Sequence, residues 1–177
     1  VPGKNLGAII NKQSKERIES YINQAEQDGA ELKLDGRGGQ VSGKENGFYV
    51  GPTVIDQVKS SMTVASDEVF GPVLSIIRCR NIEEALEIQN KSSYGNGASV
   101  YTRSGSLAKH VRERLTAGMI GTNVGVPVPR EPFSFGGIKN SKFGTGDITG
   151  KSSINFWTDL IKYTTKWDKE AGVNWMS

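Results

Sequence analysis

The chain has 177 residues, of which 36% are hydrophobic and 23% charged, and these values are typical of a folded globular protein. They exclude a disordered chain, and no apolar run is long enough to cross a bilayer. The net charge of +3 is small and the basic residues are spread among acids, so we expect neither a nucleic-acid partner nor a membrane partner. Because the first residues lack a signal-peptide pattern, we expect a cytoplasmic protein.

The chain contains one cysteine and one histidine, and both limit its chemistry. A single Cys79 excludes an internal disulfide and a cysteine-based zinc site, so we predict no metal site. Cys79 ends an apolar run, which favours a buried or half-buried structural thiol over a redox thiol. His110 falls in a charged segment, and a solvated helix face is expected for it.

The first third of the chain predicts a helix, a strand and a loop. Ser14 is the predicted cap of a helix with apolar residues at helical spacing, which Gly29 ends. The alternating segment Glu31–Leu34 predicts a half-exposed strand. The glycine-rich segment 35–47 predicts a surface loop, because no Gly-Lys-Ser/Thr follows it as in a phosphate-binding loop. Residues 48–50 and 53–55 predict two short strands, or one edge strand with a break at Pro52.

The most informative stretch is Asp-Glu-Val-Phe-Gly-Pro-Val at 67–73. Glu68 and Phe70 stand just before a Gly-Pro pair that ends regular structure, so we expect both at the mouth of the strand that follows. Ligands bind at strand ends in open α/β sheets, which makes this edge a candidate cofactor site. The simpler interpretation is that Glu68 is a helix cap and Phe70 belongs to the core.

From residue 73 the chain predicts a strand–helix–strand–helix–strand order. The strands are expected at 73–79, 98–101 and 119–124, and the helices at 82–91, capped by Asn81, and at 107–115. Short connections of this kind call for parallel strands joined by right-handed crossovers. The predicted fold class is therefore α/β, with a mainly parallel open sheet flanked by helices.

An irregular segment follows, with three prolines and two aromatics between 125 and 137. A loop of this composition is more often the wall of a site than a connector. Ser152 or Ser153 is then predicted to cap a short helix. The segment 160–167 is rich in β-formers and predicts a strand that pairs with a distant part of the chain or with another subunit. The tail from 168 is expected to be loose surface.

These motifs resemble the C-terminal part of the catalytic domain of the aldehyde dehydrogenase superfamily. Residues 68–73 look like its Glu-x-Phe-Gly-Pro motif, and residues 135–141 look like Pro-Phe-Gly-Gly-x-Lys-x-Ser, with Ser134 where proline is commoner. The segment 123–135 is most similar to the methylmalonate-semialdehyde dehydrogenase branch. Gly136 replaces that branch's threonine and 144–150 departs from its pattern, so a different substrate range stays open.

The resemblance implies a role for each matching position. Glu68 is expected to accept hydrogen bonds from the nicotinamide ribose of NAD, or of NADP, and Phe70 to pack near the nicotinamide. Val126, Pro127, Phe133 and Phe135 are expected in the wall of the aldehyde pocket. Residues 1–157 would form the catalytic-domain portion, and 158–177 an oligomerisation strand and tail, with Lys162 to Trp167 pairing subunits of a homo-oligomer.

The resemblance also implies an NAD(P)-dependent oxidoreductase acting on an aldehyde, with methylmalonate semialdehyde and an acyl-CoA product as one reading. The family's nucleophilic cysteine lies upstream of the matched region, and Cys79 is in the wrong segment to replace it. We therefore predict no catalytic residue in this chain and no activity of the chain alone. The alternative is a non-catalytic α/β binding or oligomerisation module derived from that family.

Overall fold

The computed structural model describes residues 4–167 and confirms the α/β class. The chain divides into two compact units, Val1–Ser92 and Ser93–Ser177, which are described separately below. The elements in chain order are α1 (Lys12–Gln27), β1 (Glu31–Leu34), β2 (Thr53–Asp56), α2 (Thr63–Ser66), β3 (Val73–Ser75), α3 (Ile82–Lys91), β4 (Tyr94–Gly95), β5 (Gly97–Val100), α4 (Gly105–Arg114), β6 (Met119–Thr122), β7 (Ile138–Lys139) and α5 (Ser152–Trp157).

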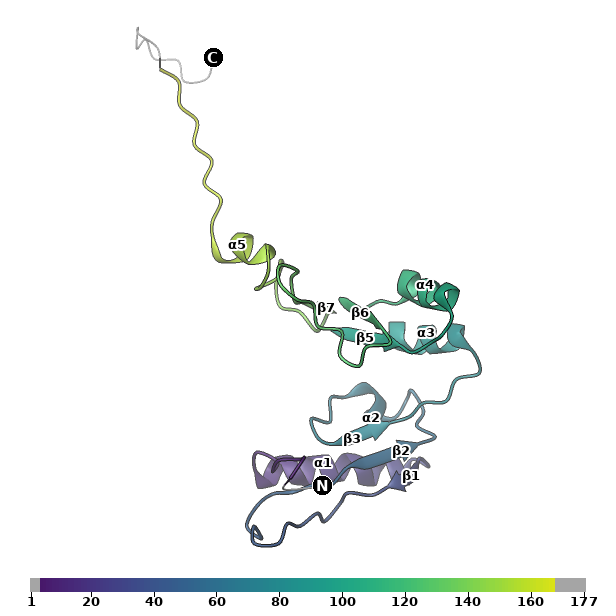
Figure 1. The fold of residues 1–177 in the computed structure, drawn as a ribbon. Helices are drawn as coiled ribbons and strands as arrows, with labels where there is room; N and C mark the ends of the chain where they lie inside the picture. Colours follow the sequence, from purple (N-terminus) through teal and green to yellow (C-terminus); the bar gives the residue numbers. More distant parts are fainter. Residues whose placement is uncertain (1–3, 168–177) are drawn as a thin grey trace. The chain divides into compact units, whose positions relative to one another are not determined.

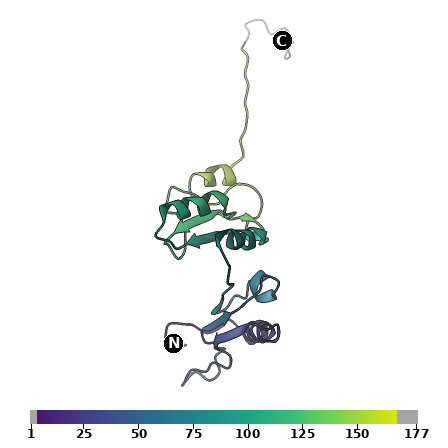
Figure 2. The same cartoon turned by 90° about the vertical axis from the view of Figure 1, so that its right-hand side faces the viewer.

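The first unit is built on a three-stranded sheet in the order β1-β2-β3. β1 runs antiparallel to β2, and β2 runs parallel to β3 with Thr53 opposite Val73. Helix α1 lies along this sheet in both views (Figures 1 and 2). Its buried residues Ile18, Ile22 and Ala25 follow the i, i+4, i+7 spacing of one helix face, which explains why the sequence pattern identified this helix.

The core of the first unit joins α1 to the central strand. Ile18, Ile22 and Ile55 are fully buried, and Val50, Val58, Met62 and Val64 complete the same cluster. Burying an isoleucine side chain stabilises a fold by about 1.5–3 kcal/mol, so α1 is firmly held on its sheet. A loop that is bonded to α1 is therefore held in a fixed position relative to the sheet.

Asp56 at the end of β2 is buried and paired. The Arg78 guanidinium donates to its Oδ1 from Nε at 2.9 Å and to its Oδ2 from a terminal nitrogen at 2.6 Å. This pairing lowers the pKa of Asp56 below its usual value. The link ties the chain after β3 back to the central strand.

Four local predictions for the first unit are wrong. Helix α1 begins two residues before Ser14, because Asn11 Oδ1 accepts the hydrogen bond from the Ser14 amide at 2.7 Å and acts as the cap. Residues 48–50 are not a strand, and the strand predicted over 73–79 ends at Ser75. Ile76 still donates to the Ile55 carbonyl and accepts from the Val58 amide, but the chain then leaves β2, and Cys79 is exposed rather than buried or half-buried.

The second unit contains two small sheets. β5 and β6 are parallel, with Gly97 opposite Met119, and α4 connects them as predicted. β4 and β7 form a short antiparallel pair that the sequence did not reveal. The strand that begins at residue 73 pairs with β2, so the described strands form three separate sheets instead of one. The order of these strands along the chain was predictable, but the strand beside which each one lies in a sheet depends on tertiary contacts.

Helix α5 is present, although its cap residue is Lys151 and neither predicted serine caps it. The chain from 158 to 167 contains no strand and runs extended (Figure 1). Four apolar side chains in it are more than four-fifths exposed: Leu160, Ile161, Tyr163 and Trp167. Pairing of this segment with another subunit stays a prediction, as does the domain boundary at 157, and the tail from 168 lies outside the described residues.

Candidate functional site

The loop between α2 and β3, residues 67–71, carries the two predicted cofactor contacts and is called the cofactor loop below. Glu68 is exposed and Phe70 is 75% exposed, so Phe70 is not part of the core. The backbone of Phe70 has a φ of +57°, in the left-handed region that a bulky residue rarely adopts. Such a conformation persists only where the surroundings hold it.

Helix α1 supplies those surroundings. The Tyr21 hydroxyl donates to Asp67 Oδ2 at 2.9 Å, and the Arg17 guanidinium donates to the Glu68 carbonyl oxygen at 3.4 Å. The guanidinium carbon of Arg17 also lies 5.8 Å from the centroid of the Tyr21 ring. The hydrogen bond to the Asp67 carboxylate raises the pKa of Tyr21 above its usual value.

The far end of the cofactor loop is packed against the same helix. A Cβ at Gly71 would lie 2.8 to 2.9 Å from three side-chain carbons of Ile18, so only glycine fits at this distance. At the near end the Asp67 amide donates to the Thr63 carbonyl at 2.9 Å. The loop is therefore fixed at both ends while Glu68 and Phe70 project outward.

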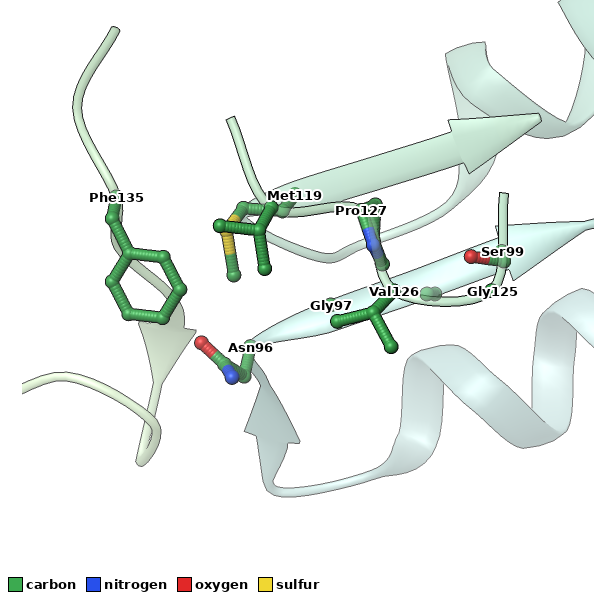
Figure 3. A pocket seen from close by; sticks show the side chains of 10 residues that line it. Asn96, Gly97, Ser99, Met119, Gly125, Val126, Pro127 and Phe135 are labelled. Atoms are coloured by element: carbon green, nitrogen blue, oxygen red, sulfur yellow. The ribbon is translucent and has the colours of Figure 1, made fainter. Parts of the chain in front are cut away.

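The second unit contains a cavity of about 440 Å³ beside β5 and β6. Figure 3 shows Phe135 facing Met119 and Asn96 at one end, with Val126 and Pro127 toward the other. Its lining consists of Asn96, Gly97, Ala98, Ser99, Met119, Gly125, Val126, Pro127, Val128 and Phe135. Three of the four predicted wall residues are thus brought together, whereas Phe133 is 71% exposed and outside the lining.

Asn123 directs the loop after β6 into this cavity wall. Its backbone φ is +56°, a conformation that asparagine tolerates well. Its side chain accepts from the Thr102 amide at 2.9 Å and donates to the Thr102 carbonyl at 3.0 Å. The chain then folds back so that Pro127 lies over Gly121, where an added Cβ would be 3.0 Å from the Pro127 ring.

Phe135 is placed by contacts with the end of the loop before α5 and with the first residue of α5. Its amide donates to Thr149 Oγ1 at 2.9 Å, and Ser134 Oγ donates to Ser152 Oγ at 2.8 Å. A Cβ at Gly136 would collide with the Asp147 carboxylate, which Lys142 holds at 2.7 Å. The two departures from the branch pattern, at 136 and within 144–150, are therefore structurally linked.

Ser99 is one of the cavity residues that sequence reasoning missed. Its Oγ is buried and has no hydrogen-bond partner within the described part of the chain, although the residue lines the cavity. A serine inside an Ala-Ser-Val strand gives no sequence signal of this kind. Apart from Ser99 and Asn96, the residues that line the cavity are glycines or apolar residues, which suits the acyl portion of a small molecule.

Within residues 4–167 no group of three or more His, Cys, Asp or Glu residues is placed to hold a metal ion. The Cys79 sulfur contacts only the Ile77 carbonyl, at 3.9 Å, among the hydrogen bonds described. No helix in the same range is long and apolar enough to cross a membrane.

Comparisons with known proteins agree on one family. The model described as "Aldehyde dehydrogenase family" matches residues 2–162. The chain is 43% identical over 165 residues to malonate-semialdehyde dehydrogenase 2 of Oceanobacillus iheyensis, a match that covers 93% of this chain and 34% of that protein. It is 44% identical over 156 residues to malonate-semialdehyde dehydrogenase of Bacillus subtilis strain 168, covering 88% and 31%.

Solved structures give the same result. A methylmalonate-semialdehyde dehydrogenase of Sinorhizobium meliloti complexed with NAD superposes with a TM-score of 0.88 at 42% identity, over 93% of this chain and 34% of that one. The corresponding enzyme of Oceanimonas doudoroffii gives 0.89 at 39% identity, over 95% and 34%. The chain spans about a third of the length of the relatives it matches.

Proposed function

This chain belongs to the aldehyde dehydrogenase family, and we propose that it supplies the nicotinamide-facing loop and part of the aldehyde pocket of a longer NAD-dependent aldehyde dehydrogenase. The observation that carries the proposal is the cofactor loop, where Glu68 and Phe70 project exposed from an anchored backbone. A carboxylate offers two acceptor oxygens to a ribose diol, and an aromatic ring can pack beside the nicotinamide.

NAD is the proposed cofactor because a structural relative was solved with it, and NADP stays the alternative. The cofactor loop would contact only the nicotinamide riboside half. Selection between NAD and NADP concerns the adenine-side ribose, and we assign no residue of this chain to it. The chain should therefore respond to the nicotinamide half alone.

A titration of the full chain separates the two halves of the cofactor. Nicotinamide mononucleotide should shift the backbone amide signals of residues 67–71 in ¹⁵N NMR spectra, and AMP should not. Glu68→Gln should weaken this binding about tenfold, because one neutral acceptor oxygen replaces the two charged ones that a diol would use. Glu113→Gln, an exposed glutamate of α4, is the matched control. Equal responses to both nucleotides, or to neither, would contradict the proposal.

We also propose that the chain by itself does not oxidise aldehydes. The family chemistry needs a cysteine thiolate, and Cys79 is exposed beyond β3 with no base or cation among its hydrogen-bond partners in the described residues. Incubation with malonate semialdehyde, NAD and coenzyme A should leave the absorbance at 340 nm unchanged. Turnover at an enzyme-like rate that Cys79→Ser abolishes would show the opposite.

For the longer enzyme we propose a small semialdehyde substrate, because relatives at about 43% identity are named for malonate semialdehyde. The more specific hypothesis is that methylmalonate semialdehyde is the substrate and that coenzyme A accepts the acyl group to give an acyl-CoA. Water is the alternative acyl acceptor. Mass spectrometry of the product formed with and without coenzyme A distinguishes these two. The cytoplasm stays the proposed location, supported by the composition, and cell fractionation tests it.

A second proposal concerns subunit pairing through Lys162 to Trp167. Tyr163 and Trp167 are 86% and 91% exposed, and at this spacing they would lie on one face of an extended segment, a pattern that favours strand addition. Thr165→Pro removes an amide donor from such a strand and should shift the chain to a smaller species in sedimentation velocity, while Thr165→Val should not. A monomeric parent chain would contradict this proposal and also the oligomerisation-module alternative.

A further inference from the structure

We propose that Tyr21 and Asp67 are positioning residues, a hydrogen-bonded pair that holds the cofactor loop so that Glu68 and Phe70 present themselves to the nicotinamide riboside. This inference rests on the proposed function of the loop. It adds two residues that contact no ligand themselves. Their bond, at 2.9 Å, joins a residue of α1 to one 46 positions later.

The pair connects the loop to the most rigid part of the first unit. Tyr21 lies on α1 between Ile18 and Ile22, both fully buried against the sheet, so its own position is set by the core. A phenol has one rigid ring and few rotatable bonds, which makes its hydroxyl a well-defined anchor. Asp67 accepts the hydrogen bond from this hydroxyl, one residue before Glu68.

The pair also separates the roles of two neighbouring acids. Asp67 is engaged by the Tyr21 hydroxyl and by Ser66 Oγ at 3.0 Å, whereas the Glu68 side chain has no hydrogen bond or ion pair in the described part of the chain. Arg17 reaches the carbonyl oxygen of Glu68 and leaves its carboxylate open. One acid therefore fixes the loop while the other remains available to a diol.

Phe70 provides a second reason for an anchor. Its left-handed backbone is unfavourable for a residue with a side chain, so a released loop would relax toward other conformations. The exposed ring contributes little packing that could resist this. The restraint has to come from the ends of the loop, where Tyr21 acts on Asp67 and Ile18 packs against Gly71.

The test combines hydrogen exchange with ligand binding on the full chain. Tyr21→Phe should accelerate exchange of the Asp67 amide, which donates to Thr63, by about fivefold, and weaken nicotinamide mononucleotide binding by a similar factor. Asp67→Ala should show both changes. Asp67→Asn keeps an acceptor oxygen, so its exchange rate and affinity should stay close to those of the parent chain. Tyr49→Phe removes the hydroxyl of a tyrosine whose ring packs against Gly47, and it is the control.

The double variant decides whether the two residues act as one unit. Tyr21→Phe with Asp67→Ala should weaken binding no more than either change alone, because both remove the same bond. Additive losses, or unchanged affinity in Tyr21→Phe while the parent chain binds, overturn this inference and leave the proposed function intact. If the parent chain gives no shift with nicotinamide mononucleotide, the proposed function fails first and the inference falls with it.

Discussion

A methyl group added at position 71 tests whether α1 sets the position of the cofactor loop. In Gly71→Ala the new Cβ would lie 2.8 Å from Ile18 Cδ1 and 2.9 Å from its Cγ1 and Cγ2. Real Cβ contacts are essentially never this short, and Ile18 is fully buried, so it has no room to withdraw. The loop or the helix must move apart.

The expected change in the free energy of unfolding follows from two opposing effects. Overpacking of a well-packed site costs about 1–3 kcal/mol. Replacing glycine by alanine where the backbone permits it stabilises by about 0.4–1 kcal/mol, and Gly71 is not among the left-handed glycines. The net expectation is a loss of about 1–2 kcal/mol. Without the contact the sign would be reversed.

Urea unfolding of the full chain, followed through the amide signals of Ile18 and Ile22, measures this change for the first unit alone. Gly7→Ala, which would meet nothing within 4 Å, should cause no loss and serves as the control. In an Ile18→Ala background all three contacting carbons are gone, so Gly71→Ala should cost nothing further. A Gly71→Ala chain as stable as the parent, or an equal loss in both backgrounds, would refute the reasoning.

Three further outcomes are expected. The hydrogen bonds from Arg78 lower the pKa of Asp56 in the folded chain. The ionised carboxylate therefore stabilises the fold above its unfolded pKa of about 3.9, and this contribution is lost as the pH falls through the lower folded pKa. The urea midpoint of Asp56→Asn should lie below that of the parent at pH 7, and the two midpoints should converge below pH 4. Phe70→Gly should leave the urea midpoint unchanged or higher, since glycine accepts the φ of +57°, yet abolish the shifts caused by nicotinamide mononucleotide. Asn123→Gly keeps the left-handed backbone but removes both bonds to Thr102, and should lower the stability of the second unit by about 1–3 kcal/mol in unfolding followed through β5 amides.

The cofactor loop shows which features of the site could be predicted from the sequence. The motif at 67–73 predicted that Glu68 and Phe70 stand before a strand, and the structure places both there, exposed. The simpler interpretation of Phe70 as core fails because its ring is 75% exposed. What the motif did not contain is the anchor, since Tyr21 and Arg17 lie about 50 residues earlier and were recognisable in sequence only as part of an amphipathic helix.

In the cavity wall, too, the sequence predicted some of the residues and only the structure identified the others. The prolines and aromatics of 125–135 identified a wall, and Val126, Pro127 and Phe135 do line one cavity. Phe133 carries the same chemistry two positions away and lies outside it. Ser99, which lines the cavity from β5, has no sequence signal, because the value of a buried hydroxyl depends on what surrounds it.

The sequence by itself determined the α/β class, the periodicity of α1 and the two family motifs, because these depend on residue types at short, regular spacings. Only the tertiary structure decided that the strand at 73 pairs with β2 and that Tyr21 holds Asp67. Each of these is a choice among several chemically equivalent partners. Such choices are made by packing and distance, which local patterns along a chain do not encode.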